Sequence, residues 1–403
     1  LFRRGDAADR CRQNENDACL KTAPRSEDPK GENGMKNFIR ISVWLLLFVS
    51  LAGCHGAAPE ARDDRFTVIA QDMPYPTDQY IRIGYTLRMW EYEKEGLDLQ
   101  QIDILDGDTR ATLFAIGKNE LPKIYKDPLP GNPYYPPEKL DHYYVSLQLP
   151  VPLGQTIPKS VTHRFHFRNS RTNRDLSLEG ATFLPDQAMT PIVIASPVRG
   201  KNWLFINQST MGYHFNAMFF ALGKRGTGER FAFDNLQFDD NLKEYFHGNP
   251  AKNESYFNYG DPLYAVADGT VVAMRDGLPE NSGNDHSVTF KDAIDLAGNY
   301  IILDIGKGRY AFYAHCRTHS IRVKAGDRVK EGDEIALLGN SGNSDAPHLH
   351  FQICDAPDFF FSRGLPFVLK KYTKIAQGGQ DVLPPPKAYE NAMMEQFTVI
   401  SFE

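Results

Sequence analysis

A loop that runs directly into a strand is the feature that most constrains this chain. Residues 339–347 are rich in glycine, asparagine, serine and proline, a composition typical of loops. Residues 348–353 then alternate in polarity, which predicts a strand. On a strand, His348 and His350 share one face, with Cα atoms about 6.6 Å apart. One imidazole can then bind a metal while the other reaches a water on that metal; the alternative is a pair of solvated histidines.

The composition bounds the fold and excludes one class of partner. A chain of 403 residues is long enough for two domains with sizeable cores. Its 32 glycines and 26 prolines indicate many turns and a β-rich fold, and the net charge of −6 gives no support for nucleic-acid binding. The five cysteines form no C-x-x-C pair, so a cysteine zinc site is not expected. Cys316 and Cys354 are expected to face opposite sides of their strands and to remain free thiols.

Residues 35–54 have the order of an export signal. A short basic start precedes the almost wholly apolar residues 41–51, which are too short to span a bilayer comfortably. The Leu-Ala-Gly-Cys sequence that ends at Cys54 resembles the lipobox of bacterial lipoproteins. That resemblance implies cleavage before Cys54 and a lipid on its sulfur; a buried apolar helix is the alternative. Residues 1–34 are polar and aperiodic, so an over-extended start or a disordered segment is expected there.

The remaining sequence predicts a mainly β protein of two domains. After a linker at residues 55–65, residues 66–197 contain short alternating segments with turn-rich joints, which predict an Ig-like β-sandwich whose partner is unknown. Residues 198–375 predict a small antiparallel sheet, and residues 376–403 a C-terminal extension. Within the second domain, we expect one hairpin over residues 262–274, with an Asp-Gly turn, and another over residues 299–316.

Four strings in the second domain resemble one enzyme family. They occupy residues 264–272, 313–315, 339–344 and 347–351. In this order and spacing they resemble the LytM/lysostaphin-type zinc metalloendopeptidases of bacterial cell walls, over roughly residues 200–370. The resemblance implies that His350 is a zinc ligand. It also implies that His315 and His348 are the family's unliganded catalytic histidines.

The other two ligands follow from a variant of the family pattern. The usual string, a His followed four residues later by an Asp, is absent because Met218 occupies the fourth position after His214. A variant branch has its His farther upstream of an Arg-Phe-Ala-apolar-Asp string, and residues 230–234 fit that string. The resemblance therefore assigns His214 and Asp234 as ligands. The spare candidates that stay open are His247, Asp239 and Asp240.

The implied chemistry is hydrolysis of a peptide bond. Three protein ligands leave the fourth tetrahedral position of zinc for water, whose pKa the metal lowers to about 7. His315 and His348 can take the proton and stabilise the oxyanion, although the sequence does not divide these roles between them. The resemblance implies a peptidoglycan peptide as substrate and Zn²⁺ as cofactor. Lipid at Cys54 would hold the protein on a membrane in the cell envelope, the outer membrane in a Gram-negative host.

Two other functions remain open. One is a catalytically degenerate envelope protein that binds cell wall or partners and regulates another hydrolase. The other is an adhesion or assembly protein that works through its sandwich domain. Degenerate relatives typically lose ligands, whereas this chain retains all five candidate residues. The sequence therefore favours the enzyme.

Overall fold

Strands dominate the computed structural model, so the predicted mainly β architecture is confirmed. The structure describes residues 65–121, 125–126, 142–206, 214–221, 224–286, 288–378 and 385–402. Residues 1–34, the expected signal segment and Cys54 lie outside the described residues. By their contacts, residues 64–403 form one compact unit. In the described ranges, no helix has both the length and the apolar character needed to cross a membrane.

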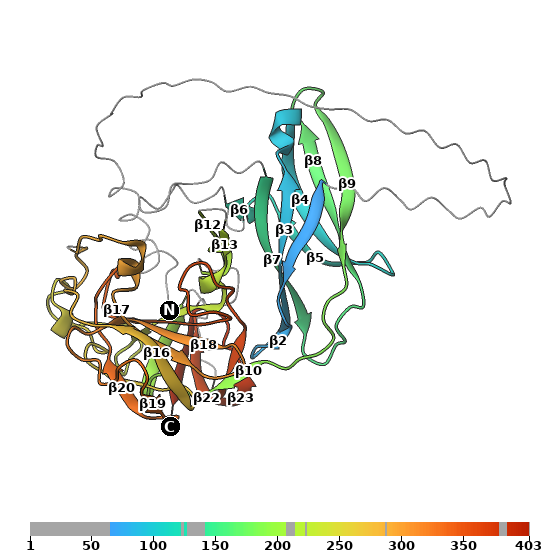
Figure 1. Ribbon diagram of the computed structural model, residues 1–403. Coiled ribbons are helices and arrows are strands. Elements are labelled where there is room, and N and C mark those ends of the chain that lie inside the picture. Colours follow the sequence, from blue (N-terminus) through green and yellow to red (C-terminus); the bar gives the residue numbers. More distant parts are fainter. Residues whose placement is uncertain are drawn as a thin grey trace, which may run out of the picture. The chain divides into compact units, whose positions relative to one another are not determined.

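The first part of the chain forms two antiparallel sheets over a shared core (Figure 1). One sheet has the order β1-β3-β7-β6, with β2 also paired to β3, and the other has the order β5-β4-β8-β9. The bounds are β1 (Phe66–Gln71), β2 (Tyr75–Pro76), β3 (Tyr80–Trp90), β4 (Leu97–Asp106), β5 (Thr112–Gly117), β6 (Tyr125–Lys126), β7 (His142–Pro152), β8 (Val161–Asn169) and β9 (Arg174–Phe183), with the 3-10 helix η1 (Tyr92–Glu95). These layers have the arrangement of a β-sandwich, and the Ig-like topology stays a prediction.

Period-two alternation explains the front sheet, which we define as β1, β2, β3, β6 and β7. Along β3, Ile83, Tyr85 and Leu87 are buried in the sandwich core, as alternate positions on a strand should be. The intervening Gly84 and Thr86 are buried as well. Strand β3 is therefore covered on both faces, and its second face lies against the rest of the unit.

The second part of the chain is one eleven-stranded sheet. Its order is β10-β22-β24-β11-β14-β21-β18-β17-β16-β19, with β23 paired to β22, and the pair β10 and β22 is parallel. The bounds are β10 (Ile192–Ile194), β11 (Gly200–Ile206), β14 (Phe233–Gln237), β16 (Gly269–Arg275), β17 (Asn299–Asp304), β18 (Tyr310–Cys316), β19 (Arg328–Val329), β21 (Leu349–Cys354), β22 (Phe367–Gln377), β23 (Lys387–Ala392) and β24 (Thr398–Phe402).

This sheet is larger than the expected small one because it recruits strands from both sides. Strand β10 comes from the segment expected to be the sandwich, and β23 and β24 come from the expected extension, residues 376–403. Strand β24 lies between β22 and β11, so the C-terminal residues are an internal part of the sheet. The central strands β14, β21 and β18 are buried among two hydrophobic clusters.

Short elements surround the large sheet. Two strand pairs flank it, β12 (Phe219–Ala221) with β13 (Lys224–Gly226) and β15 (Pro262–Tyr264) with β20 (Glu334–Leu337). The 3-10 helices of this part are η2 (His214–Asn216), η3 (Gly228–Phe231), η4 (Asn253–Ser255) and η5 (Ala293–Ala297). Helices η2 and η3 contact each other, and η3 contacts β21. Through these contacts, the segments that contain η2 and η3 lie beside β21 at the centre of the sheet.

One of the two expected hairpins forms, and the prediction of the other is wrong. Strands β17 and β18 pair over residues 299–316 as expected. Residues 262–274 do not form a hairpin, because β15 pairs with β20 while β16 pairs with β17 and β19. The carboxylate of Asp268 accepts hydrogen bonds from the Glu331 amide and the Lys330 ammonium. The Asp-Gly turn is thus tied to a distant segment instead of closing a local hairpin.

The two described cysteines are free thiols, as expected. Cys316 and Cys354 are fully buried and belong to different hydrophobic clusters. Burial raises the pKa of both thiols, that of Cys354 to about 12. Both therefore remain protonated and inert at neutral pH.

Candidate metal centre and catalytic histidines

A carboxylate and an imidazole face each other across the two central strands. In the pairing of β14 with β21, Asp234 lies directly opposite His350. The Nδ1 atom of His350 is 3.0 Å from Oδ1 of Asp234. Residues opposite each other on antiparallel strands have their side chains on the same face. The strand register therefore places these two expected ligands opposite each other.

The third expected ligand arrives from a different loop. His214 begins η2, and its Nε2 is 3.5 Å from Oδ2 of Asp234. The ligand atoms of His214, Asp234 and His350 all lie within 4.8 Å of one another. All three side chains are almost completely buried. Among the described residues, this is the group of three that could hold a metal ion.

Hydrogen bonds orient the ring of His350 for metal binding. Its Nε2 is 2.9 Å from Oε1 of Gln352, an oxygen that can only accept, so we assign the proton to Nε2. The Nδ1 lone pair is then directed at Asp234 and at the space between the three ligands. A partner on the second ring nitrogen is typical of metal-ligating histidines. Sequence reasoning missed Gln352, although its position two residues after His350 predicts the same face.

The electrostatics of the group suit a divalent cation. Burial lowers the pKa of His214 to about 4, so this ring is neutral at physiological pH. Burial acts to raise the pKa of Asp234, but the surrounding histidines outweigh it and hold that pKa well below its usual range. Imidazole nitrogens and a carboxylate are ligands that zinc takes at catalytic sites. The donor set therefore fits Zn²⁺.

Two more histidines complete the cluster. The ring centroids of His315 and His348 are 4.6 Å apart, and Nε2 of His348 is 3.5 Å from Oδ1 of Asp234. The Nδ1 atom of His315 is 2.7 Å from the Ser341 carbonyl, and that of His348 is 2.8 Å from the Ala346 carbonyl. A carbonyl only accepts, so in both rings Nδ1 carries the proton. Both histidines therefore present an Nε2 lone pair when neutral.

His315 reaches this face through an unusual backbone conformation. Ala314 lies opposite His350 in the pairing of β18 with β21, so in a regular strand His315 would face away from the metal ligands. The φ angle of His315 is +63°, in the left-handed region, and this breaks the alternation. Non-glycine residues held there are strained and cluster at functional sites. The sequence pattern did not indicate this feature.

The loop before His348 is held by buried amides that sequence reasoning also missed. The Nδ2 of Asn281 donates to the carbonyls of Asn340, Gly342 and Ser344, at 3.1, 2.8 and 3.1 Å. Asn340 in turn donates to Oδ1 of Asn253, at 2.8 Å. The carbonyls that accept from Nδ1 of His315 and His348 belong to this same loop. Asn281 lies 59 residues before Asn340, and a lone asparagine at that separation carries no signal of this role.

The spare candidates lie elsewhere. The ring of His247 stacks on Phe257, with centroids 5.7 Å apart. Oδ1 of Asp239 accepts the Lys243 amide, at 2.8 Å, and Asp240 pairs with Lys201 on the surface. None of the three belongs to the group that could hold a metal.

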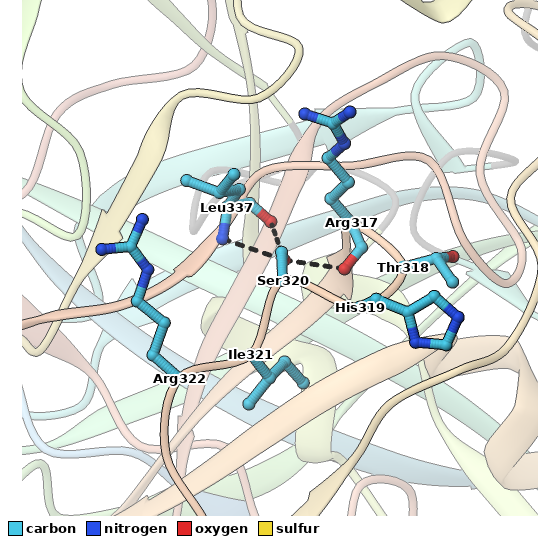
Figure 2. A pocket seen from close by; sticks show the side chains of 7 residues that line it. All are labelled: Arg317, Thr318, His319, Ser320, Ile321, Arg322 and Leu337. Atoms are coloured by element: carbon cyan, nitrogen blue, oxygen red, sulfur yellow. Dashed lines mark hydrogen bonds between the residues drawn. The ribbon is translucent and has the colours of Figure 1, made fainter.

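A surface hollow on the loop after His315 is separate from this cluster. Figure 2 shows its lining, where the Ser320 hydroxyl bonds to the backbone of Arg317 and Leu337. The guanidinium of Arg317 lies over the Tyr259 ring, and that of Arg322 pairs with Glu334. None of the five candidate residues lines the hollow. We assign no ligand to it.

The Gln352→Leu variant is expected to bind zinc about 10- to 100-fold more weakly, because Nε2 of His350 loses the acceptor that selects its tautomer. Leucine preserves the volume, so the fold should survive. Competition with a chromophoric chelator would measure the affinity. The matched control is Gln101→Leu, since Gln101 is a half-buried glutamine of β4, in the other sheet of the sandwich, that bonds to Oδ1 of Asp103. Equal affinities in Gln352→Leu and the wild type would contradict the prediction.

Comparison with known proteins finds a peptidase-family match over part of the cluster. Residues 255–358 match Peptidase family M23. An uncharacterized metalloprotease of Haemophilus influenzae is 34% identical over 161 residues, which cover 38% of this chain and 30% of the relative. The peptidoglycan DD-endopeptidase ShyA of Vibrio cholerae is 35% identical over 22% of this chain and 20% of its own. The murein hydrolase activator EnvC of Escherichia coli is 28% identical over 26% of this chain and 25% of its own.

The matches cover only part of the chain and only part of the proposed site. This chain spans less than a third of the length of the relatives named. The family match includes His315, His348 and His350 but ends short of His214 and Asp234. The assignment of those two ligands therefore rests on the geometry of the cluster.

Proposed function

We propose that this protein is a zinc-dependent endopeptidase that hydrolyses peptide bonds of peptidoglycan. The observation that supports it is the buried group of His214, Asp234 and His350, with the Nε2 atoms of His315 and His348 available beside it. The M23 match over residues 255–358 and the peptidoglycan endopeptidase among the relatives support the substrate class.

The reaction divides between the metal and the two histidines. When bound by His214, Asp234 and His350, zinc would supply a water of lowered pKa and polarise the scissile carbonyl. A neutral His348, with its proton on Nδ1, can accept a proton at Nε2. Burial and the neighbouring His348 lower the pKa of His315 well below its usual value, so that ring stays neutral at physiological pH. Once it carries a proton on Nε2, either histidine can donate to the leaving amine or the oxyanion.

The test is digestion of purified peptidoglycan by the purified protein. We expect one zinc per chain, release of soluble fragments, loss of release with a chelator and recovery on addition of zinc. Mass spectrometry of the fragments would identify the bond that is cut. A protein that binds zinc but releases nothing, and instead stimulates a second hydrolase, would contradict the proposal in favour of the regulator alternative.

We also propose that the protein is lipid-anchored in the cell envelope through Cys54, on the outer membrane if the host has one. The support is the sequence order of residues 35–54. The Cys54→Ser variant is expected to accumulate as unprocessed precursor without lipid, because the acceptor sulfur is gone. Mass spectrometry of the N-terminal peptide checks this. An exported protein that still carries residues 1–34 would contradict it.

A further inference from the structure

A single arginine joins the front sheet to the helix beside the metal ligands. Arg230 is 1% exposed and lies in η3. Its Nη1 donates to Oδ2 of Asp72 at 3.0 Å, and its Nη2 donates to the Ser146 hydroxyl at 2.9 Å and to the Thr86 hydroxyl. Asp72 follows β1, Thr86 lies on β3 and Ser146 on β7. The partners of this guanidinium are therefore spread over the front sheet, while its own backbone belongs to η3, which contacts η2 and β21.

The same arginine is close to two of the three expected ligands. Its guanidinium carbon lies 5.0 Å from the centre of the Phe215 ring, and Phe215 directly follows His214. Ala232 directly follows η3, and its amide bonds to the Glu229 carbonyl at 2.8 Å. Helix η2, which begins at His214, contacts η3, and β14 with Asp234 begins directly after Ala232. A shift of η3 would therefore move His214 and Asp234 together.

The front sheet is shaped to receive this loop. Gly84 lies on β3, and a Cβ atom there would be 2.6 Å from Oδ2 of Asp72 and 3.3 Å from the Phe215 ring. The Asp72 amide bonds to the Gly84 carbonyl at 2.8 Å, which fixes the carboxylate against the same strand. Charged groups this deeply buried are costly unless they are paired and hydrogen-bonded. Arg230 and Asp72 therefore specify one position of the loop against the sheet.

We propose that Asp72, which follows β1, acts together with Thr86 and Ser146 of the front sheet through Arg230, and that all three are positioning residues for the metal centre that hold His214 and Asp234 at binding distance. This rests on the proposed zinc site. The segment that matches M23 contains only one of the three expected ligands, His350. The proposal gives the front sheet a role in the peptidase, because the sheet would position the other two. His350, on the central strand β21, is placed by the sheet register and not by this contact.

The test compares two carboxylates that pair with arginines across the same junction. Asp72→Asn removes the charge opposite Arg230 and keeps the volume. Glu395→Gln does the same to Glu395, which pairs with Arg82 of β3 at 2.7 Å, away from η2 and η3. Each variant of the full chain is titrated with zinc against a chromophoric chelator, and its cobalt form is examined by absorption spectroscopy.

We expect Asp72→Asn to bind zinc about tenfold or more weakly and to alter the cobalt spectrum. Glu395→Gln should stay within about twofold of the wild type, even if both variants unfold at lower temperature. Ser146→Ala, which removes one hydrogen bond, should weaken zinc binding in the same direction if Asp72→Asn does not fold. Wild-type affinity in Asp72→Asn or Ser146→Ala, or equal weakening in Glu395→Gln, would overturn the inference. Failure of the wild type to bind zinc would instead refute the proposed site.

Discussion

His350→Ala is expected to abolish stoichiometric zinc binding and to reduce peptidoglycan hydrolysis to background. His350 faces Asp234 from the neighbouring strand, at 3.0 Å, so its removal leaves one imidazole and one carboxylate. Two ligands do not make the three-ligand set of a catalytic zinc site. His214→Ala and Asp234→Ala should have the same effect, because each supplies one ligand atom to the same group. Metal analysis of the desalted proteins, together with fragment release, measures both outcomes.

The spare residues provide the controls for this prediction. His247→Ala, Asp239→Ala and Asp240→Ala should keep one zinc per chain, because their partners are Phe257, Lys243 and Lys201 and not the ligand group. Circular dichroism would show whether His350→Ala is folded. A metal-bound structure with His247 or Asp239 as a ligand would refute the assignment.

His348→Ala and His315→Ala are expected to keep zinc while hydrolysis falls about 10²- to 10⁴-fold, the usual contribution of a positioned acid or base. Neither residue belongs to the group of three ligands. In both rings the Nδ1 proton is held by a backbone carbonyl, so each variant loses one Nε2 beside the ligands and leaves the metal donors unchanged. The loss should appear in kcat more than in KM, because the proton transfers occur in the transition state.

The two variants also test the division of roles. If His348 is the base, kcat should fall further in His348→Ala than in His315→Ala. If the two histidines act as a unit, the double variant should hydrolyse peptidoglycan at most slightly more slowly than the slower of the two single variants. Loss of zinc in either variant, to the extent seen for His350→Ala, would mean that the ligand and catalytic roles are misassigned.

Much of the candidate site follows from local sequence. The loop before His348 and the alternation of residues 348–353 predict a strand with both histidines on one face. The structure has β21 beginning at Leu349, and both rings approach the carboxylate of Asp234. The hairpin of β17 and β18 was predictable for the same reason, because its two strands are joined by a short turn. Features set by neighbours in the chain are the ones that a single sequence can show.

Only the tertiary structure decided the features that depend on contacts between segments far apart in the sequence. The hairpin expected at residues 262–274 is replaced by strand pairs with segments far along the chain, since the hydrogen bonds of Asp268 go to residues 330 and 331. The left-handed φ of His315 has no signature in the sequence. The separation of twenty positions between His214 and Asp234 gives no sign that η2 and η3 contact each other, with η2 against β7 of the front sheet. The sequence by itself therefore determined which side chains could form the site, and the long-range contacts of β14, β21 and Arg230 decided where they meet.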